Sequence, residues 1–156
     1  MNYEIIAKQE MLFQFDTFSH DLGIEIGLWL LNKARSDGKS IAVDISKCGQ
    51  QIFHAALEGT TVDNDEWLRK KKNTVYRLNQ STLGIQLKLK EQGVTLEQAL
   101  HLSPADYVAA GGGFPIVVRG VGFIGAIAVT GTSDVDEHER IISCLSALLG
   151  VSHYPK

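Results

Sequence analysis

The sequence is poor in cysteine and in long apolar runs. Its two cysteines, Cys48 and Cys144, lie far apart and match no CxxC or Cys/His spacing. This argues against a disulfide framework or a zinc site and favours reduced thiols in a cytoplasmic protein. No run approaches the roughly 20 apolar residues of a membrane span, and charged residues interrupt the apolar N-terminal stretch. We therefore expect neither a membrane span nor a signal peptide.

Net charge is also small. The formal value of -3 leaves no global basic field for nucleic acid or an anionic membrane. The one basic run, residues 69–72, follows Asp63, Asp65 and Glu66, a mixture typical of a solvated helix. The sequence also lacks a serine elbow, HExxH, a Walker sequence and paired catalytic carboxylates, so spacing alone demonstrates no enzyme.

The 156 residues are enough for one domain with its own core, which we expect to span residues 1–156. Hydrophobic periodicity and capping signals divide the chain into elements. Helices are expected at residues 12–35, 65–91 (with interruptions), 96–100, 103–110 and 134–149, and strands at 40–46, 51–57, 115–118 and 121–130. The strands come as two hairpins and the helices as separate blocks. This order predicts an α+β fold with an antiparallel sheet flanked by helices.

A literal GxGxxG occurs at Gly120, Gly122 and Gly125 in the stretch RGVGFIGAIAVTG. A dinucleotide-binding fingerprint must open a helix, whereas alternating bulky and small residues follow here, as in a strand. We interpret Gly120 to Gly122 as a tight hairpin turn. Gly125, inside the strand, indicates a bulge or a close approach by another backbone or a ligand. Small neighbours suggest that a helix packs closely there, with a flat ligand as the alternative.

Lys71 lies in the apolar face of the long predicted helix. On a helical wheel it falls inside an arc of about 100° formed by Trp67, Leu68, Val75 and Leu78. One interpretation is that its stem lies along the apolar surface and its ammonium reaches solvent. The other is that the cation is held over a pocket for an anionic ligand.

Two histidines need an interpretation as well. His138 follows the acidic start of the last predicted helix. It is either solvated or a ligand for metal or haem, or an acid/base group. His54 shares one strand face with Ile52 and Ala56, which favours a satisfied, half-buried side chain.

Two stretches, HAALEGTTVDNDEWLRKKKNTVYRL and GGGFPIVVRGVGFIGAIAVTGTSDVDEH, resemble an uncharacterised bacterial and fungal family. It is grouped with the haem-degrading domain proteins, relatives of the glycolate-operon and secreted haem-binding proteins, and the match covers nearly the whole chain. The family's recurrent residues fall on Asn64, Trp67, Lys71, Asn73, Thr74, Gly113, Phe114, Pro115, Gly125, Gly131 and His138. The loop 130–133 departs from the pattern because it lacks the usual proline.

The resemblance implies a profilin-like domain that forms homodimers and often larger homo-oligomers. For some relatives it also implies haem binding and slow haem breakdown. The leading hypothesis is therefore a ligand-binding domain with a pocket between the second helix block, the GGGFP loop and the last helix. Haem or another anionic planar molecule is its expected ligand. The residues assigned to this pocket are Trp67, Lys71, Asn73, Thr74, Gly112, Gly113, Phe114 and His138.

In this pocket Lys71 pairs with a carboxylate, while Trp67 and Phe114 stack on the ligand. The small Gly112 and Gly113 let backbone amides approach, and His138 is the candidate iron ligand. Two alternatives stay open. One is a non-catalytic interaction module in which the same residues serve packing and oligomer contacts. The other is a small-molecule enzyme with His138 or Lys71 as its acid/base group.

Overall fold

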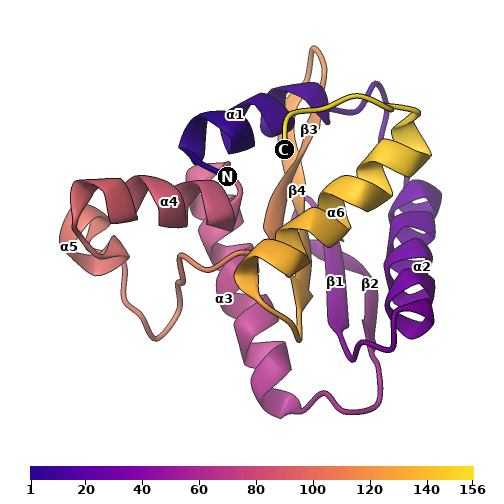
Figure 1. Ribbon diagram of the computed structural model, residues 1–156, viewed down its shortest axis with the longest axis horizontal. Helices are drawn as coiled ribbons and strands as arrows, with labels where there is room; N and C mark the ends of the chain where they lie inside the picture. The colour runs from indigo at the N-terminus through magenta and orange to yellow at the C-terminus, as the bar shows by residue number, and fades with distance from the viewer.

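One antiparallel sheet of four strands, in the order β2-β1-β4-β3, forms the centre of the computed structural model, which describes residues 1–156 (Figure 1). The strands are β1 (Ala42–Lys47), β2 (Gln50–Ala56), β3 (Gly113–Val118) and β4 (Gly122–Thr130). Each hairpin, β1–β2 and β3–β4, stays together, and β1 joins them by pairing with β4. The expected α+β fold with an antiparallel sheet of two hairpins is confirmed.

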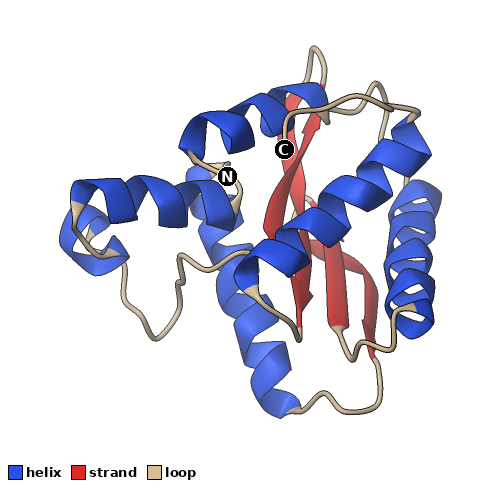
Figure 2. Ribbon diagram, viewed as in Figure 1, coloured by secondary structure: helices blue, strands red, loops and turns tan.

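Helices cover both faces of this sheet (Figure 2). They are α1 (Tyr3–Leu12), α2 (His20–Ser36), α3 (Val62–Leu78), α4 (Thr82–Gln92), α5 (Leu96–Leu100) and α6 (Asp134–Leu149). On one face α2 packs on β1 and β2, while α6 packs on β3 and β4; on the other, α3 packs on β1, β3 and β4. The pair α4 and α5 extends away from the sheet (Figure 1). None of the six helices has both the length and the apolar character that a membrane crossing requires.

The main hydrophobic core lies between the sheet and the helices α2 and α6. It contains 19 buried residues, among them Ile26, Ile45, Ile127 and Ile141. Because side chains alternate along a strand, neighbouring residues of β1 and β4 face α3 instead. There Ala42 and Ala128 meet Leu68 in a small separate cluster.

The predicted helix over residues 12–35 is wrong at its start. The chain leaves α1 after Leu12, and Ser19 caps α2 by accepting a hydrogen bond from Leu22 N at 3.1 Å. Between the two helices, Phe15 lies extended beside β3 and Phe18 is also buried in the core. Their spacing matched a helical stripe because both face the same core, although neither is helical.

The predicted helix over residues 65–91 is two helices. The first begins at Val62, after a capping box between Thr61 and Asn64, and ends at Asn79 in the left-handed conformation. Ser81 then caps α4. The short helix at 96–100 and the final helix at 134–149 are confirmed, whereas the helix expected at 103–110 is wrong and only a turn forms there.

Gly125 lies at a close approach of two backbones. A Cβ at this position would lie 2.1 Å from the carbonyl oxygen of Ser46 in β1. Of the predicted alternatives, the neighbour is therefore another strand rather than a helix or ligand. Just before Gly125 the register with β3 shifts between Ile116 and Val117, which leaves Ile124 without a partner and breaks the expected alternation. Phe123 therefore contacts Tyr76 of α3, with ring centroids 5.3 Å apart.

Candidate functional site

A buried ion pair joins α3 to α6. Lys71 Nζ donates hydrogen bonds to Glu137 Oε2 at 2.5 Å and to the carbonyl oxygen of Val129 at 3.0 Å. Both charged side chains are only 3% exposed. The other oxygen of Glu137 accepts the amides of Gly131 at 2.8 Å and Thr132 at 3.0 Å. The prediction that the Lys71 ammonium reaches solvent is wrong, because an internal carboxylate neutralises it.

The electrostatics of Glu137 depend on this partner. Burial raises the pKa of its carboxyl, while Lys71 and the amides of Gly131 and Thr132 act in the opposite direction. Hydrogen bonds to a charged group are stronger than those between neutral groups, and a buried charge without a partner is costly. The carboxylate therefore requires Lys71 in order to remain buried.

Of the three glycines at residues 111–113, where β3 begins, Gly112 lies against the ion pair. Gly112 has a φ of +102°, and a Cβ there would lie 2.3 Å from the carbonyl oxygen of Val129 and 2.9 Å from Lys71 Nζ. The Gly112 carbonyl accepts the amide of Val129 at 2.8 Å, and the Gly113 amide donates to Thr82 Oγ1 at 2.8 Å. The Gly113 amide is thus already used inside the fold, and Gly112 leaves no space for a larger residue beside Lys71.

His138 is completely buried in α6. Its Nε2 lies 2.8 Å from Gln9 Oε1, and Gln9 Nε2 donates to the carbonyl oxygen of Pro155 at 2.7 Å. Since the amide nitrogen of Gln9 is the donor to Pro155, its oxygen must be the acceptor, so His138 carries its proton on Nε2. Burial lowers the pKa of His138 to about 4, and its Nδ1 has no hydrogen-bond partner.

Phe114 lies next to His138, with ring centroids 5.9 Å apart. The structure therefore places Lys71, Phe114, His138 and the glycines in one region of the interior, where the first three are no more than 2% exposed. Trp67 does not join them. Its side chain is 40% exposed on α3, and its Nε1 donates to Asp63 at 3.2 Å.

Asn73 and Thr74 form hydrogen bonds to a segment that follows α5. Asn73 Nδ2 donates to the carbonyl oxygen of Asp106 at 2.9 Å, and Thr74 Oγ1 accepts the amide of Val108 at 3.0 Å. Arg69 adds an ion pair to Asp106 at 3.0 Å. These contacts from one side of α3 hold the segment 105–108 in place.

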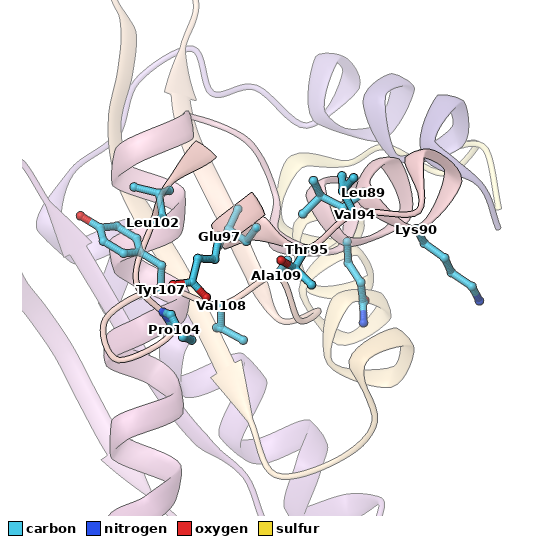
Figure 3. Close-up of a pocket in the computed structure, with 12 residues that line it drawn as sticks. Leu89, Lys90, Val94, Thr95, Glu97, Leu102, Pro104, Tyr107, Val108 and Ala109 are labelled. Carbon is cyan, nitrogen blue, oxygen red and sulfur yellow. The ribbon is translucent and has the colours of Figure 1, made fainter. Parts of the chain in front are cut away.

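That segment forms one wall of a cavity of about 450 Å³ between α4, α5 and residues 102–109 (Figure 3). We call it the α4–α5 bay. Its lining residues are Gln86, Leu89, Lys90, Val94, Thr95, Leu96, Glu97, Leu102, Pro104, Tyr107, Val108 and Ala109. Its volume lies within the range of about 300–1,000 Å³ that is usual for small-molecule sites.

Apolar side chains dominate the bay. Leu89, Leu96 and Leu102 are buried in a small cluster that is separate from the main core. Two charged side chains lie at different places: Glu97 is turned towards Val108, and Lys90 points away from the centre (Figure 3). No histidine or cysteine lines the bay. The lining therefore fits a flat, largely apolar molecule and offers haem iron no imidazole.

Sequence reasoning missed Glu137, Gln9 and the bay. Glu137 lies in the first turn of α6, where Ser133 is the cap and accepts the amide of Asp136 at 3.3 Å. The carboxylate of Glu137 takes no part in this cap and reaches Lys71 instead. The signal that could have indicated Glu137 is an acidic residue in the first turn of a helix, shortly after Gly131 and Thr132, whose backbone amides it accepts. For Gln9 no local signal exists, because its partner residues lie more than a hundred positions away.

Comparisons with known proteins agree with this fold. A family model described as "Haem degrading protein HbpS-like" matches residues 18–146. A UPF0303 protein of Sinorhizobium medicae (strain WSM419) is 40% identical over 148 residues, which cover 95% of this chain and 90% of the relative. Its sequence is thus similar along nearly the full length of both proteins.

Two solved structures share the architecture. The crystal structure of Ybr137w protein superposes with a TM-score of 0.89 at 24% identity, covering 97% of this chain and 90% of that one. A structure of a PduOC:Heme complex superposes with a TM-score of 0.67 at 19% identity, covering 84% and 94%. At these identities the likeness establishes the fold alone. Because the family model and the relative span most of the sequence, the chain belongs to the HbpS-like family.

Proposed function

We propose that this protein is a small-ligand-binding domain and that the α4–α5 bay holds its ligand, a flat and largely apolar molecule of the haem class. The bay itself carries the proposal, since it is an open cavity of about 450 Å³ with a mostly apolar lining. The family description and the heme complex of a similar fold suggest the ligand class.

Burial of apolar surface supplies the affinity in this proposal. Each Å² of apolar surface removed from water contributes roughly 25 cal/mol, and a flat ring lying on Leu89, Val94 and Leu102 removes surface on both sides. Lys90 at the rim complements carboxylates that stay close to water. Glu97, by contrast, disfavours an anionic group on the side of the bay near Val108.

The two walls of the bay differ in rigidity. Residues 105–108 are fastened to α3 by Arg69, Asn73 and Thr74. The opposite wall, α5, packs mainly on the small cluster around Leu96. Local stability follows the number of buried contacts, so α5 is the wall that adjusts to the ligand.

Haem, when bound, would supply a redox-active iron. The residues of the bay bind and orient the ring and exclude water from its faces, and none of them is a histidine that could ligate the metal. The proposal is therefore binding by burial and charge complementarity. It assigns no reaction.

A paired titration tests this directly. Haemin and metal-free protoporphyrin IX are added separately to the folded protein, and binding is followed by absorbance and by quenching of tryptophan fluorescence. Because the proposal rests on burial and charge and assigns no residue of the bay to the iron, both should bind with similar affinity. Binding of haemin alone would indicate ligation of the iron, by Tyr107 in the bay or by a histidine such as His138, and would contradict binding by burial and charge alone. Absence of binding by either molecule would overturn the proposed function.

Variants then locate the site. Val94→Asp places a charge on the lining and Ala109→Trp fills the cavity, so each should weaken binding at least about tenfold, or 1.4 kcal/mol. Val62→Asp, at a position 80% exposed outside the bay, is the matched control. Lys90→Glu should weaken binding of the dicarboxylic ligand more than Lys88→Glu on the same helix. Loss of binding in a Lys71→Met variant shown to be folded, but not in Val94→Asp, would instead assign the ligand to the cluster of Lys71, Phe114 and His138.

A further inference from the structure

The two edge strands of the sheet, β3 and β2, differ in how far other segments of the chain cover them. Beside β3, the extended residue Phe15 donates its amide to the Val117 carbonyl and accepts the Arg119 amide, both at 2.8 Å. Pro115 also lies on this strand and has no amide to offer. The β3 edge is thus partly covered. The other edge strand, β2, has β1 as its only neighbour in the sheet.

The outward groups of β2 can be identified from its register. Leu57 N donates to the Ile41 carbonyl at 2.9 Å, and Ala55 pairs with Val43. In an antiparallel ladder alternate residues bond to the same neighbour, so Ala55 faces β1. His54 and Ala56 then present their N–H and C=O groups to the outside. Only another strand can pair with such a row along its length.

From Phe53 onward this edge lacks charged residues and proline as protection against pairing; the one bulge of β2 lies before this part, at Ile52, where the register with β1 shifts. Exposed edges commonly carry lysine, other charged residues or proline. The strand Gln50–Ala56 contains none of these. An antiparallel copy would therefore meet it without placing like charges opposite each other.

A pair of exposed apolar side chains flanks the same edge. On α2, Ile24 is 38% and Leu28 is 50% exposed. At 3.6 residues per turn they lie about 60° and 100° around the helix from Gly27, which packs against the Phe53 ring of β2. Ile26 lies about 100° the other way, and its carbonyl faces Cys144 of α6. Ile24 and Leu28 therefore lie on the side of α2 that points beyond β2.

We propose that β2 is the association surface for a second copy of this chain, which pairs antiparallel about a twofold axis at Ala55. This register brings the outward groups of His54 and Ala56 opposite those of Ala56 and His54 in the second copy. The two four-stranded sheets become one continuous sheet, and the interface is isologous because the same surface is used twice.

The side chains fit this register. On the α2 face, Phe53 lies opposite Leu57 of the second copy, and the two Ala55 residues face each other. Phe53, Ala55 and Leu57 already pack against the main core and are only partly buried. Pairing removes their remaining apolar surface from water. On the α3 face His54 meets the small Ala56.

Helix α2 follows the same symmetry. It packs on both β1 and β2, so its axis lies above the space between them. With strands about 4.8 Å apart, the two copies of α2 come about 10 Å from each other, which is a normal packing distance for helices. Ile24 and Leu28 are then covered from solvent. Neither part of the surface requires the α4–α5 bay.

The mass of the protein in solution tests the proposal. Light scattering after gel filtration should give an even number of copies. Ala56→Pro removes an outward amide, and Leu28→Glu charges the flank without touching the strand, so each should halve the measured mass while circular dichroism stays unchanged. Met11→Glu, at an exposed site of α1 (70%), should leave the mass as it is. A monomeric wild-type protein, or an unchanged mass in a folded Leu28→Glu variant, would overturn the proposal.

Cross-linking tests the register. In a Cys48→Ser background, Ala55→Cys places two thiols opposite each other at the twofold axis, and oxidation should give a disulfide-linked dimer in high yield. Met11→Cys in the same background should remain unlinked. If His54→Cys forms the dimer and Ala55→Cys does not, the axis lies elsewhere and the proposed register is wrong.

Discussion

Glu137 and Lys71 hold three parts of the fold together with one pair of charges. Through its Oε2, Glu137 reaches α3, and through its Oε1 it binds the Gly131 and Thr132 amides at the end of β4. Lys71 in turn contacts the carbonyl of Val129 in β4. The pair is therefore a joint between α3, α6 and the sheet.

Removing one partner should be far more harmful than removing both. Lys71→Met leaves Glu137 buried without a counter-charge and should cost about 3–5 kcal/mol of unfolding free energy. The double variant Lys71→Met/Glu137→Leu should recover a large part of this loss. Urea denaturation of the single and double variants measures the coupling. A Lys71→Met variant as stable as the wild type would show that the ion pair does not stabilise the packing of α3 and α6 on the sheet.

The same variant has a pH signature. Without Lys71, burial raises the pKa of Glu137 with less opposition. A carboxyl with a raised folded pKa binds its proton more readily in the folded state, so the stability deficit of Lys71→Met should shrink as the pH falls towards that pKa. Urea midpoints of this variant and of the wild type between neutral and acidic pH provide the comparison. A deficit that is constant across this range would contradict the assignment.

His138 should make the fold sensitive to mild acid. Burial lowers its pKa from 6.5 to about 4, so the unfolded chain binds a proton that the folded protein refuses. The resulting stability is complete above the unfolded pKa of 6.5 and is lost as the pH falls through the window down to about 4. The loss amounts to roughly 3 kcal/mol.

Unfolding free energies at neutral pH and near pH 4 measure this effect. His138→Gln should lose less stability between the two conditions than the wild type, even if it is less stable at neutral pH. His153→Gln, at an exposed histidine, should follow the wild type. Parallel pH profiles for His138→Gln and the wild type would show that another group is responsible.

Gly112 and Gly38 form a matched pair of glycines with positive φ. Alanine at Gly112, with a φ of +102°, collides with the Val129 carbonyl, whereas alanine at Gly38, with a φ of +66°, meets nothing within 4 Å. Gly38→Ala should cost about 1 kcal/mol for the backbone alone. Gly112→Ala should cost about 3 kcal/mol or more, because steric overlap adds to it. Thermal unfolding separates them, and equal melting temperatures would refute the sealing role of Gly112.

Thr74 should control the mobility of the segment 105–108. Thr74→Val keeps the shape but removes the acceptor of the Val108 amide. We expect faster amide hydrogen exchange in this segment, by about tenfold for a loss near 1.4 kcal/mol, with exchange in β4 unchanged. Ligand affinity should fall in parallel if the bay is the site. Ser152→Ala, at an exposed position, provides the control.

The hairpins were predictable because side-chain alternation is a local property of strands. The start of α2 was not, since Phe15 and Phe18 show helical spacing while lying in an extended segment. Helix α1 also escaped prediction: its buried residues Ile6 and Gln9 form too short a pattern to stand out. Where tertiary contacts determine the conformation of a segment, its hydrophobic periodicity can indicate the wrong secondary structure.

For the candidate site, the sequence indicated residues but not their partners. Lys71 stood out because a cation rarely lies in an apolar arc, yet its counter-ion is 66 positions away. Asn73 and Thr74 were named from the family pattern and turn out to bind the wall of the bay. The bay itself arises where three segments meet, and no single stretch contains its shape.

The way the α4–α5 lobe is attached has a consequence for how this fold can diversify. Its outer part, from Gln86 to Ala109, contributes no strand to the four-stranded sheet, and its segment 105–108 is anchored to α3 through Arg69, Asn73 and Thr74. A lobe taken from a relative could therefore be grafted onto this scaffold if those three anchors are kept. The ligand preference would then change with the exchanged lobe, while the sheet and the helices that pack on it would stay the same.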